Sequence, residues 1–111
     1  MEHRDIIILK KVMSELSIAQ NLLGDNSYEE FEGNELLKRA ICMTVINIGE
    51  LVKNLSDDFR LSHRSVPWKE IAGFRDIAAH KYQTLRMEDV YETVTSDFPA
   101  LYSQLENILA Q

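Results

Sequence analysis

ELLKRAICMTVINIGELVKNL, residues 35–55, is the segment from which the architecture of this chain follows. Its apolar positions are spaced alternately by four and three residues, at Leu37, Ile41, Thr44, Ile48, Leu51 and Leu55. That spacing places them on one face of a helix. More apolar residues lie off this face, at Leu36, Ala40, Met43, Val45, Ile46 and Val52. A helix that is apolar over most of its circumference is buried on more than one side.

Such a helix has two explanations in a chain of only 111 residues. We expect one of its sides to face a second subunit, which would make the protein a homodimer. Alternatively, it is the central helix of a bundle and is surrounded by its own chain.

The segments that flank this helix also have helical patterns. Apolar residues recur at helical spacing over residues 4–23, and Ser27 with Glu30 has the pattern of a capping box that begins a short helix. Further helices are predicted over residues 67–80 and 87–95, and a last one that Pro99 opens or kinks, while residues 56–66 are polar with a turn at 56–58. No segment has a strand pattern. We therefore expect an all-α fold, an up-and-down bundle of four to five helices in a single domain over residues 1–111.

The composition indicates the cellular compartment of the protein. Cys42 is the only cysteine, so no disulfide framework is possible and a reducing compartment is expected. The strongest apolar run near the N-terminus, residues 6–9, is too short for a signal peptide or a membrane span. We expect a cytoplasmic protein with no membrane partner.

The charge distribution is uneven. The chain has a net charge of −6, yet residues 60–86 contain six basic residues and only two acidic ones, which gives this window +4 and the rest −10. A basic segment in an acidic protein suits contact with a phosphate backbone. The candidate nucleic-acid-binding residues are Arg60, Arg64, Lys69, Lys81 and Arg86. Solvated cations on a loop and a helix would give the same pattern.

The chemically richest stretch is Arg75–Tyr82, RDIAAHKY. Arg75 is permanently charged and suits phosphate oxygens, while His80 titrates near neutral pH and can transfer protons. Asp76 lies four residues before His80 and could orient its ring. Arg75 and His80 are five residues apart, or about 140° around a helix, so a two-fold dimer would bring them together better than one helix. A solvated helix face is the alternative, and no zinc-ligand spacing or phosphate-binding glycine loop is present.

The chain resembles HEPN-domain proteins of the HepT-like class. The resemblance covers nearly the whole chain. It rests on Ile48-Gly49-Glu50, on Val66–Asp76 (VPWKEIAGFRD), on His80-Lys81-Tyr82 and on Asp97–Leu101 (DFPAL). Arg75, His80 and Tyr82 match the order and spacing of the family signature, which is Arg, four residues, His, one residue, Tyr.

The resemblance implies a homodimeric, all-helical endoribonuclease that needs no metal or cofactor and is the toxin of a type VII-like toxin–antitoxin pair. Arg75 and His80 correspond to the catalytic pair, and Asp76 to the polar residue that commonly follows the arginine. The antitoxin partner would be a minimal nucleotidyltransferase that inactivates the toxin by transferring AMP from ATP to Tyr82. Lys81 departs from the family, in which glycine is frequent at this position. Two alternatives stay open: a non-catalytic scaffold that binds RNA or nucleotide, and a helical partner protein of a nucleotidyltransferase.

Overall fold

The computed structural model describes all residues, 1–111, and every element in it is helical. In chain order the elements are α1 (His3–Leu23), α2 (Tyr28–Glu32), α3 (Glu35–Lys53), α4 (Asp57–Ser62), α5 (Trp68–His80), the 3₁₀ turn η1 (Tyr82–Thr84), α6 (Met87–Glu92), the π-helical turn η2 (Thr93–Asp97) and α7 (Phe98–Leu109). None of these helices is both long and apolar enough to cross a membrane.

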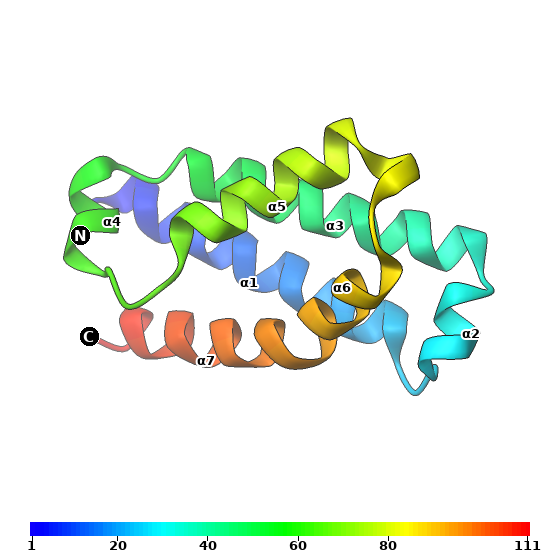
Figure 1. Cartoon of the computed structure of the whole chain (residues 1–111). Helices are drawn as coiled ribbons and strands as arrows, with labels where there is room; N and C mark the ends of the chain where they lie inside the picture. The colour runs from blue at the N-terminus through cyan, green and yellow to red at the C-terminus, as the bar shows by residue number, and fades with distance from the viewer.

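The long helices form an up-and-down bundle (Figure 1). The chain runs away from the end that holds both termini in α1, returns in α3, runs out again in α5 and returns through α6, η2 and α7. The short helices α2 and α4 lie at opposite ends of the bundle, where the chain reverses. This arrangement confirms the predicted all-α bundle.

The predicted polar connection over residues 56–66 is wrong in part, because it contains the helix α4. Ser56 begins this helix by accepting a hydrogen bond from the Phe59 amide at 3.2 Å, and Phe59 is buried. The same serine donates from its hydroxyl and its amide to the carboxylate of Asp5, at 2.7 and 2.9 Å. Asp5 is only 1% exposed, so this polar contact fastens the start of α4 to the start of α1 inside the protein.

Pro99 lies in the first turn of α7, as predicted, but no loop separates α7 from α6. The chain stays helical from Met87 to Leu109, with one wider turn at η2 in which the Phe98 amide donates to the Thr93 carbonyl. Pro99 has no amide hydrogen to donate to the preceding turn. The π-helical turn reorganises the hydrogen bonds just before this position, so the helix continues instead of ending.

The helix α3 is central in the bundle, which is the alternative to the expected contact with a second subunit. It packs against α1 on one side and α5 on the other, and its buried hydrophobic residues belong to one hydrophobic core of 23 residues. Its own chain therefore covers most of its circumference. Leu36 and Met43 remain 83% and 55% exposed, so part of its apolar surface is still uncovered.

Candidate active site

Gly49 brings α3 and α5 into direct contact at Arg75. A Cβ atom on Gly49 would overlap the Cβ of Arg75 and lie 2.5 Å from its Cγ. Only a residue without a side chain lets the stem of Arg75 lie on the α3 backbone. Gly49 thus lets α3 and α5 approach each other closely.

The guanidinium of Arg75 belongs to a row of alternating charges across the two helices. It pairs with Glu50 on α3 and with the Oδ1 atom of Asp76 at 3.1 Å, while Lys53 Nζ reaches the same Oδ1 at 2.6 Å. Only 19% of the Arg75 side chain is exposed, and its Nε is buried without a hydrogen-bond partner. These contacts hold the Arg75 side chain in one position, with its guanidinium between α3 and α5.

Asp76 does not orient His80 as the sequence suggested. Hydrogen bonds from Lys53 and then from Arg75 lower the pKa of the Asp76 carboxyl group, which keeps it ionised. Lys53 comes from α3, so sequence spacing on α5 alone could not reveal this competitor. His80 is exposed at the C-terminal end of α5 and makes no side-chain hydrogen bond or ion pair within the protein.

Tyr82 lies just after α5 ends, in the 3₁₀ turn η1, and its ring is half-buried against the beginning of α3. Its hydroxyl donates to Glu35 Oε2 at 3.1 Å, and the Arg39 guanidinium lies 4.9 Å from the centre of its ring. Burial, reinforced by Glu35, raises the pKa of the Tyr82 phenol. Glu35 and Arg39 are functional candidates that sequence reasoning missed, since 47 residues separate Glu35 from Tyr82.

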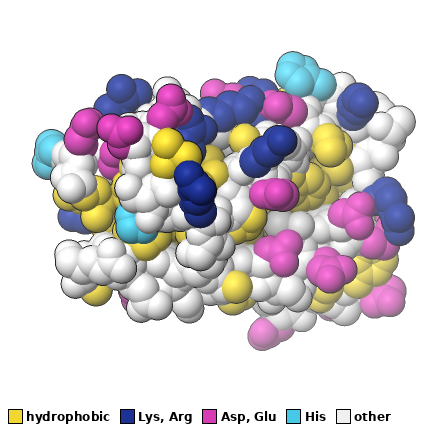
Figure 2. Space-filling view, turned by 60° about the vertical axis from the view of Figure 1, so that its left-hand side comes forward, with side chains coloured by type: hydrophobic (Ala, Val, Ile, Leu, Met, Phe, Trp, Pro, Cys, Tyr) yellow, Lys and Arg dark blue, Asp and Glu magenta, His cyan; other side chains and the backbone are white.

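The predicted RNA-binding residues do not form one basic patch. Figure 2 shows the lysines and arginines of the visible face interspersed with acidic side chains. Arg60 pairs with Asp57 and Arg86 with Glu88, two carboxylates that lie just outside the basic sequence window. Arg64, Lys69 and Lys81 are exposed and make no ion pair. Nowhere do three or more His, Cys, Asp or Glu side chains gather in a group that could hold a metal ion.

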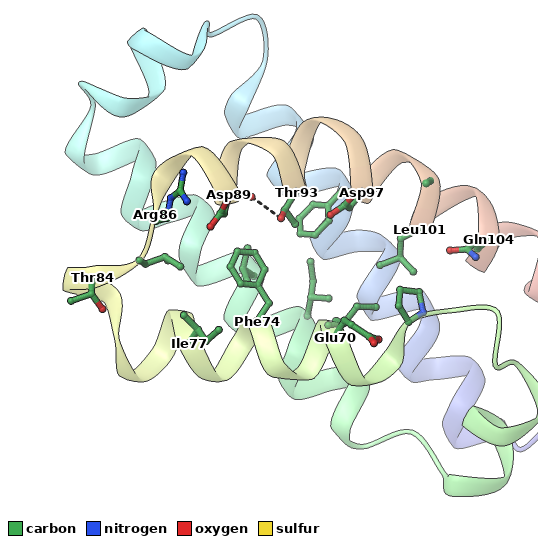
Figure 3. Close-up of a pocket in the computed structure, with 17 residues that line it drawn as sticks. Glu70, Phe74, Ile77, Thr84, Arg86, Asp89, Thr93, Asp97, Leu101 and Gln104 are labelled. Atoms are coloured by element: carbon green, nitrogen blue, oxygen red, sulfur yellow. Dashed lines mark hydrogen bonds between the residues drawn. The ribbon is translucent and has the colours of Figure 1, made fainter.

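A groove of about 560 Å³ separates α5 from α6, η2 and α7 (Figure 3). Val45 and Ile48 of α3 contribute to its lining, Phe74 points into it from α5, and Ile77 stays 46% exposed beside it. Acidic residues and Arg86 also line it. The sequence did not predict this groove, because its two walls are separated along the chain and only the packing of the bundle sets their distance.

A helical bundle that carries the Arg75, His80 and Tyr82 signature at the end of one helix matches a known class of ribonucleases. The family described as ribonuclease HepT-like matches residues 12–108 of this chain, which therefore belongs to the HepT-like ribonuclease family.

Relatives of similar length support this assignment. The chain is 37% identical to a protein named "Putative RNase" from Caldanaerobacter subterraneus subsp. tengcongensis, over 91% of this chain and 90% of the relative. It is 34% identical to a "Putative RNase" of Methanocaldococcus jannaschii, over 98% and 95%. It is 26% identical to a "Probable ribonuclease HepT" of Thermococcus cleftensis, over 96% and 94%. No solved structure matches the chain at comparable significance.

Proposed function

We propose that this protein is a metal-independent endoribonuclease in which Arg75 and His80 carry out the cleavage of RNA. The observation that carries the proposal is the fixed position of Arg75 against Gly49, five residues before an exposed His80, in a chain of the HepT-like ribonuclease family. The arginine stem is fixed by packing, and its guanidinium suits a phosphate that displaces Glu50 or Asp76. An exposed histidine is accessible to a substrate.

The chemistry requires only these groups and the substrate. RNA supplies its own nucleophile, the 2′-hydroxyl group. His80 acts as general base toward this hydroxyl or as general acid toward the leaving 5′-oxygen. Arg75 stabilises the negative charge that develops on the phosphate in the transition state. The expected product is a 2′,3′-cyclic phosphate.

The complete site is expected to form between two copies of the chain. Arg75 points to the seam with α3, while His80 lies exposed at the end of α5, and no contact joins the two within one protomer. The groove beside α5 and the exposed Ile77 offer apolar surface to a second copy. A two-fold axis beside α5 would bring Arg75 of one protomer close to His80 of the other.

The protein is also proposed to be the toxin of a toxin–antitoxin pair. Its partner would be a minimal nucleotidyltransferase that transfers AMP from ATP to Tyr82. The adduct places a negative phosphate and a nucleoside two residues beyond His80, where it repels RNA and blocks its access. The position of Tyr82 just beyond α5, where the residue is partly exposed, supports this role.

Replacement of the two proposed catalytic residues tests the activity. Arg75→Ala and His80→Ala should each abolish cleavage of an RNA substrate by purified protein, and EDTA should leave the wild-type rate unchanged. His3→Ala is a matched control, because His3 is an exposed histidine at the start of α1. Circular dichroism should show the same helical content in all variants.

Three outcomes would contradict the proposal. Activity that disappears with EDTA and returns with a divalent ion would refute the metal-independent mechanism. Cleavage that survives His80→Ala would remove His80 from the reaction. RNA binding without any cleavage by the wild-type protein would favour a non-catalytic scaffold.

A further inference from the structure

The strongest cluster of reactive side chains outside the proposed ribonuclease pair surrounds the hydroxyl of Tyr82. Glu35 Oε2 accepts this hydroxyl at 3.1 Å and also accepts from Arg39 Nε at 2.7 Å. Lys38 Nζ lies 3.6 Å from the other oxygen of Glu35. Two cations thus hold one carboxylate against one phenol, where Tyr82 of η1 meets the first residue of α3.

We propose that Glu35 is the general base that activates Tyr82 for its modification. This inference rests on the proposed transfer of AMP to Tyr82 and adds the residue of this chain that removes the proton. The acceptor would therefore bring its own base to the reaction, and the nucleotidyltransferase would need only to deliver ATP in the correct orientation.

The step balances with ATP as the only co-reactant. The oxygen of Tyr82 attacks the α-phosphorus of ATP, and a new O–P bond forms between them. The bond from this phosphorus to the bridging oxygen breaks, and pyrophosphate leaves with its electrons. The proton of the phenol passes to the carboxylate of Glu35, from which it is released to solvent.

The environment explains why Tyr82 needs a base. Burial and the neighbouring Glu35 raise the pKa of the phenol, so Tyr82 is neutral and weakly nucleophilic at physiological pH. The hydrogen bond from Tyr82, and then the contacts with Arg39 and Lys38, lower the pKa of the Glu35 carboxyl group, so it is ionised. The acidity of the phenol proton rises as the O–P bond forms, and a carboxylate already bonded to it can accept it at that moment.

Arg39 makes the position selective. Its Nε is bonded to Glu35, while its terminal amino groups make no hydrogen bond within the protein and its side chain is 59% exposed. These groups lie over the Tyr82 ring, where they would meet the phosphate of an incoming nucleotide. The carboxylate of Glu35 and the guanidinium of Arg39 thus both lie next to the Tyr82 phenol.

The chain contains a second tyrosine–glutamate pair that serves as a control. The hydroxyl of Tyr28 donates to Glu88 Oε1 at 2.8 Å, and Arg86 binds the same carboxylate at 3.0 Å. The Tyr28 ring, however, is packed edge-on against Tyr91, and no cation lies over it. If a hydrogen-bonded carboxylate were sufficient, Tyr28 would be modified as readily as Tyr82.

The experiment measures how fast Tyr82 is modified in the full chain. Wild type, Glu35→Gln and the matched control Glu88→Gln are incubated with ATP, Mg²⁺ and a minimal nucleotidyltransferase of the kind proposed as the partner, and the adduct is mapped by mass spectrometry. Glu35→Gln should slow the modification by about 100-fold or more, since general-base catalysis contributes at least that much. Glu88→Gln should leave the rate unchanged. Circular dichroism verifies that both variants are folded.

A second measurement does not need the partner protein. An arylsulfonyl fluoride reacts with a tyrosine when the phenol oxygen attacks sulfur, fluoride leaves and a nearby base takes the proton. Tyr82 should react faster than Tyr28 in the wild type, and Glu35→Gln should remove the difference.

The outcomes separate this inference from the proposed function. Equal rates for Glu35→Gln and wild type in both measurements would overturn Glu35 as the base, whatever the fate of the ribonuclease proposal. A wild type that the active nucleotidyltransferase does not modify, but whose Tyr82 reacts with the sulfonyl fluoride through Glu35, would overturn AMP transfer and retain Glu35 as the base. Modification that maps to Tyr28 instead of Tyr82 would overturn both.

Discussion

Asp76 illustrates how the neighbours of a residue, more than its spacing, define its role. Its position four residues before His80 allows a hydrogen bond between them, yet its carboxylate faces Lys53 and Arg75. The charged Lys53 donor lies 2.6 Å from this carboxylate, and a hydrogen bond between charged groups is stronger than one between neutral groups. Asp76 therefore acts on Arg75 directly, while any effect that it has on His80 passes through solvent or a second subunit.

The ion pairs of Asp76 predict a specific sensitivity to acid. Lys53 and then Arg75 lower the folded-state pKa of this carboxyl group, so its contribution to stability is present above the unfolded pKa and is lost as the pH falls through the folded value. Below about pH 4, the ordinary value for aspartate, the melting temperature of the wild type should fall. Asp76→Asn should lose stability at pH 7 and show a smaller further loss at pH 3.

Thermal melts at pH 7 and pH 3 provide the measurement. Asp25→Asn is the matched control, because Asp25 is exposed in the turn after α1 and makes no ion pair. Equal acid sensitivity of Asp76→Asn and wild type would mean that the Lys53 and Arg75 contacts contribute nothing to folding.

Sequence spacing could locate the candidate catalytic residues but not their partners. Arg75, His80 and Tyr82 lie within eight residues, so one motif finds them together. The residues that set their charge and position, Glu50 and Glu35, come from α3, and tertiary packing alone brings them there. Two residues that are 47 positions apart, such as Glu35 and Tyr82, share no spacing pattern that a single sequence could reveal.

At the scale of elements, two glycines in helices have opposite roles. Gly49 lies in α3 where a side chain would overlap the stem of Arg75, whereas a Cβ at Gly73 in α5 would meet nothing within 4 Å. Glycine is unfavourable in a helix because it loses the most backbone freedom on folding. Gly49 is therefore required by packing, while Gly73 has no such requirement within the protomer.

The same substitution should consequently change stability in opposite directions. Gly49→Ala should lower the free energy of unfolding by about 2–3 kcal/mol, since the overlap with Arg75 forces α3 and α5 apart. Gly73→Ala should raise it by about 0.5–1 kcal/mol through helix propensity alone. Urea denaturation of both variants beside the wild type measures the two effects, and a neutral Gly49→Ala would show that the helices separate at little cost.

The elements that sequence reasoning missed have physical causes. The capping box of α2 forms as predicted, because Ser27 and Glu30 bond to each other's backbone within one turn. The helix α4 lies in the segment 56–66, which the sequence predicts to be a polar connection, because its single buried side chain, Phe59, leaves no apolar period to detect. The continuity of α6 through α7 depends on a π-helical turn, which has no sequence signature that distinguishes it from a break before Pro99.

At the scale of the whole molecule, one protomer has an apolar groove that its own chain does not fill. The helix α5 packs closely on α3, but the groove of about 560 Å³ separates it from α6, η2 and α7. Apolar residues of three elements line this groove, among them Ile48, Phe74 and Leu101. A bundle of this size gains stability from every apolar surface that it covers, so an open apolar groove favours association with another copy.

Association through this groove is the last prediction. Light scattering at micromolar concentration should give about twice the chain mass of 12.8 kDa. Ile77→Lys should convert the protein to a monomer and abolish RNA cleavage, because it places a charge on apolar surface beside the groove and separates Arg75 of one protomer from His80 of the other. Far-ultraviolet circular dichroism should be unchanged, since Ile77 is half exposed within the protomer.

Leu36→Lys is the matched control for this surface. Leu36 is the most exposed large apolar residue of the chain, at 83%, but it lies at the start of α3, outside the residues that line the groove. A dimer that Leu36→Lys dissociates and Ile77→Lys leaves intact would move the interface to the uncovered face of α3. A wild type that is monomeric yet cleaves RNA would contradict a site formed between two copies. Arg75 and His80 of one α5 would then act on the same phosphate.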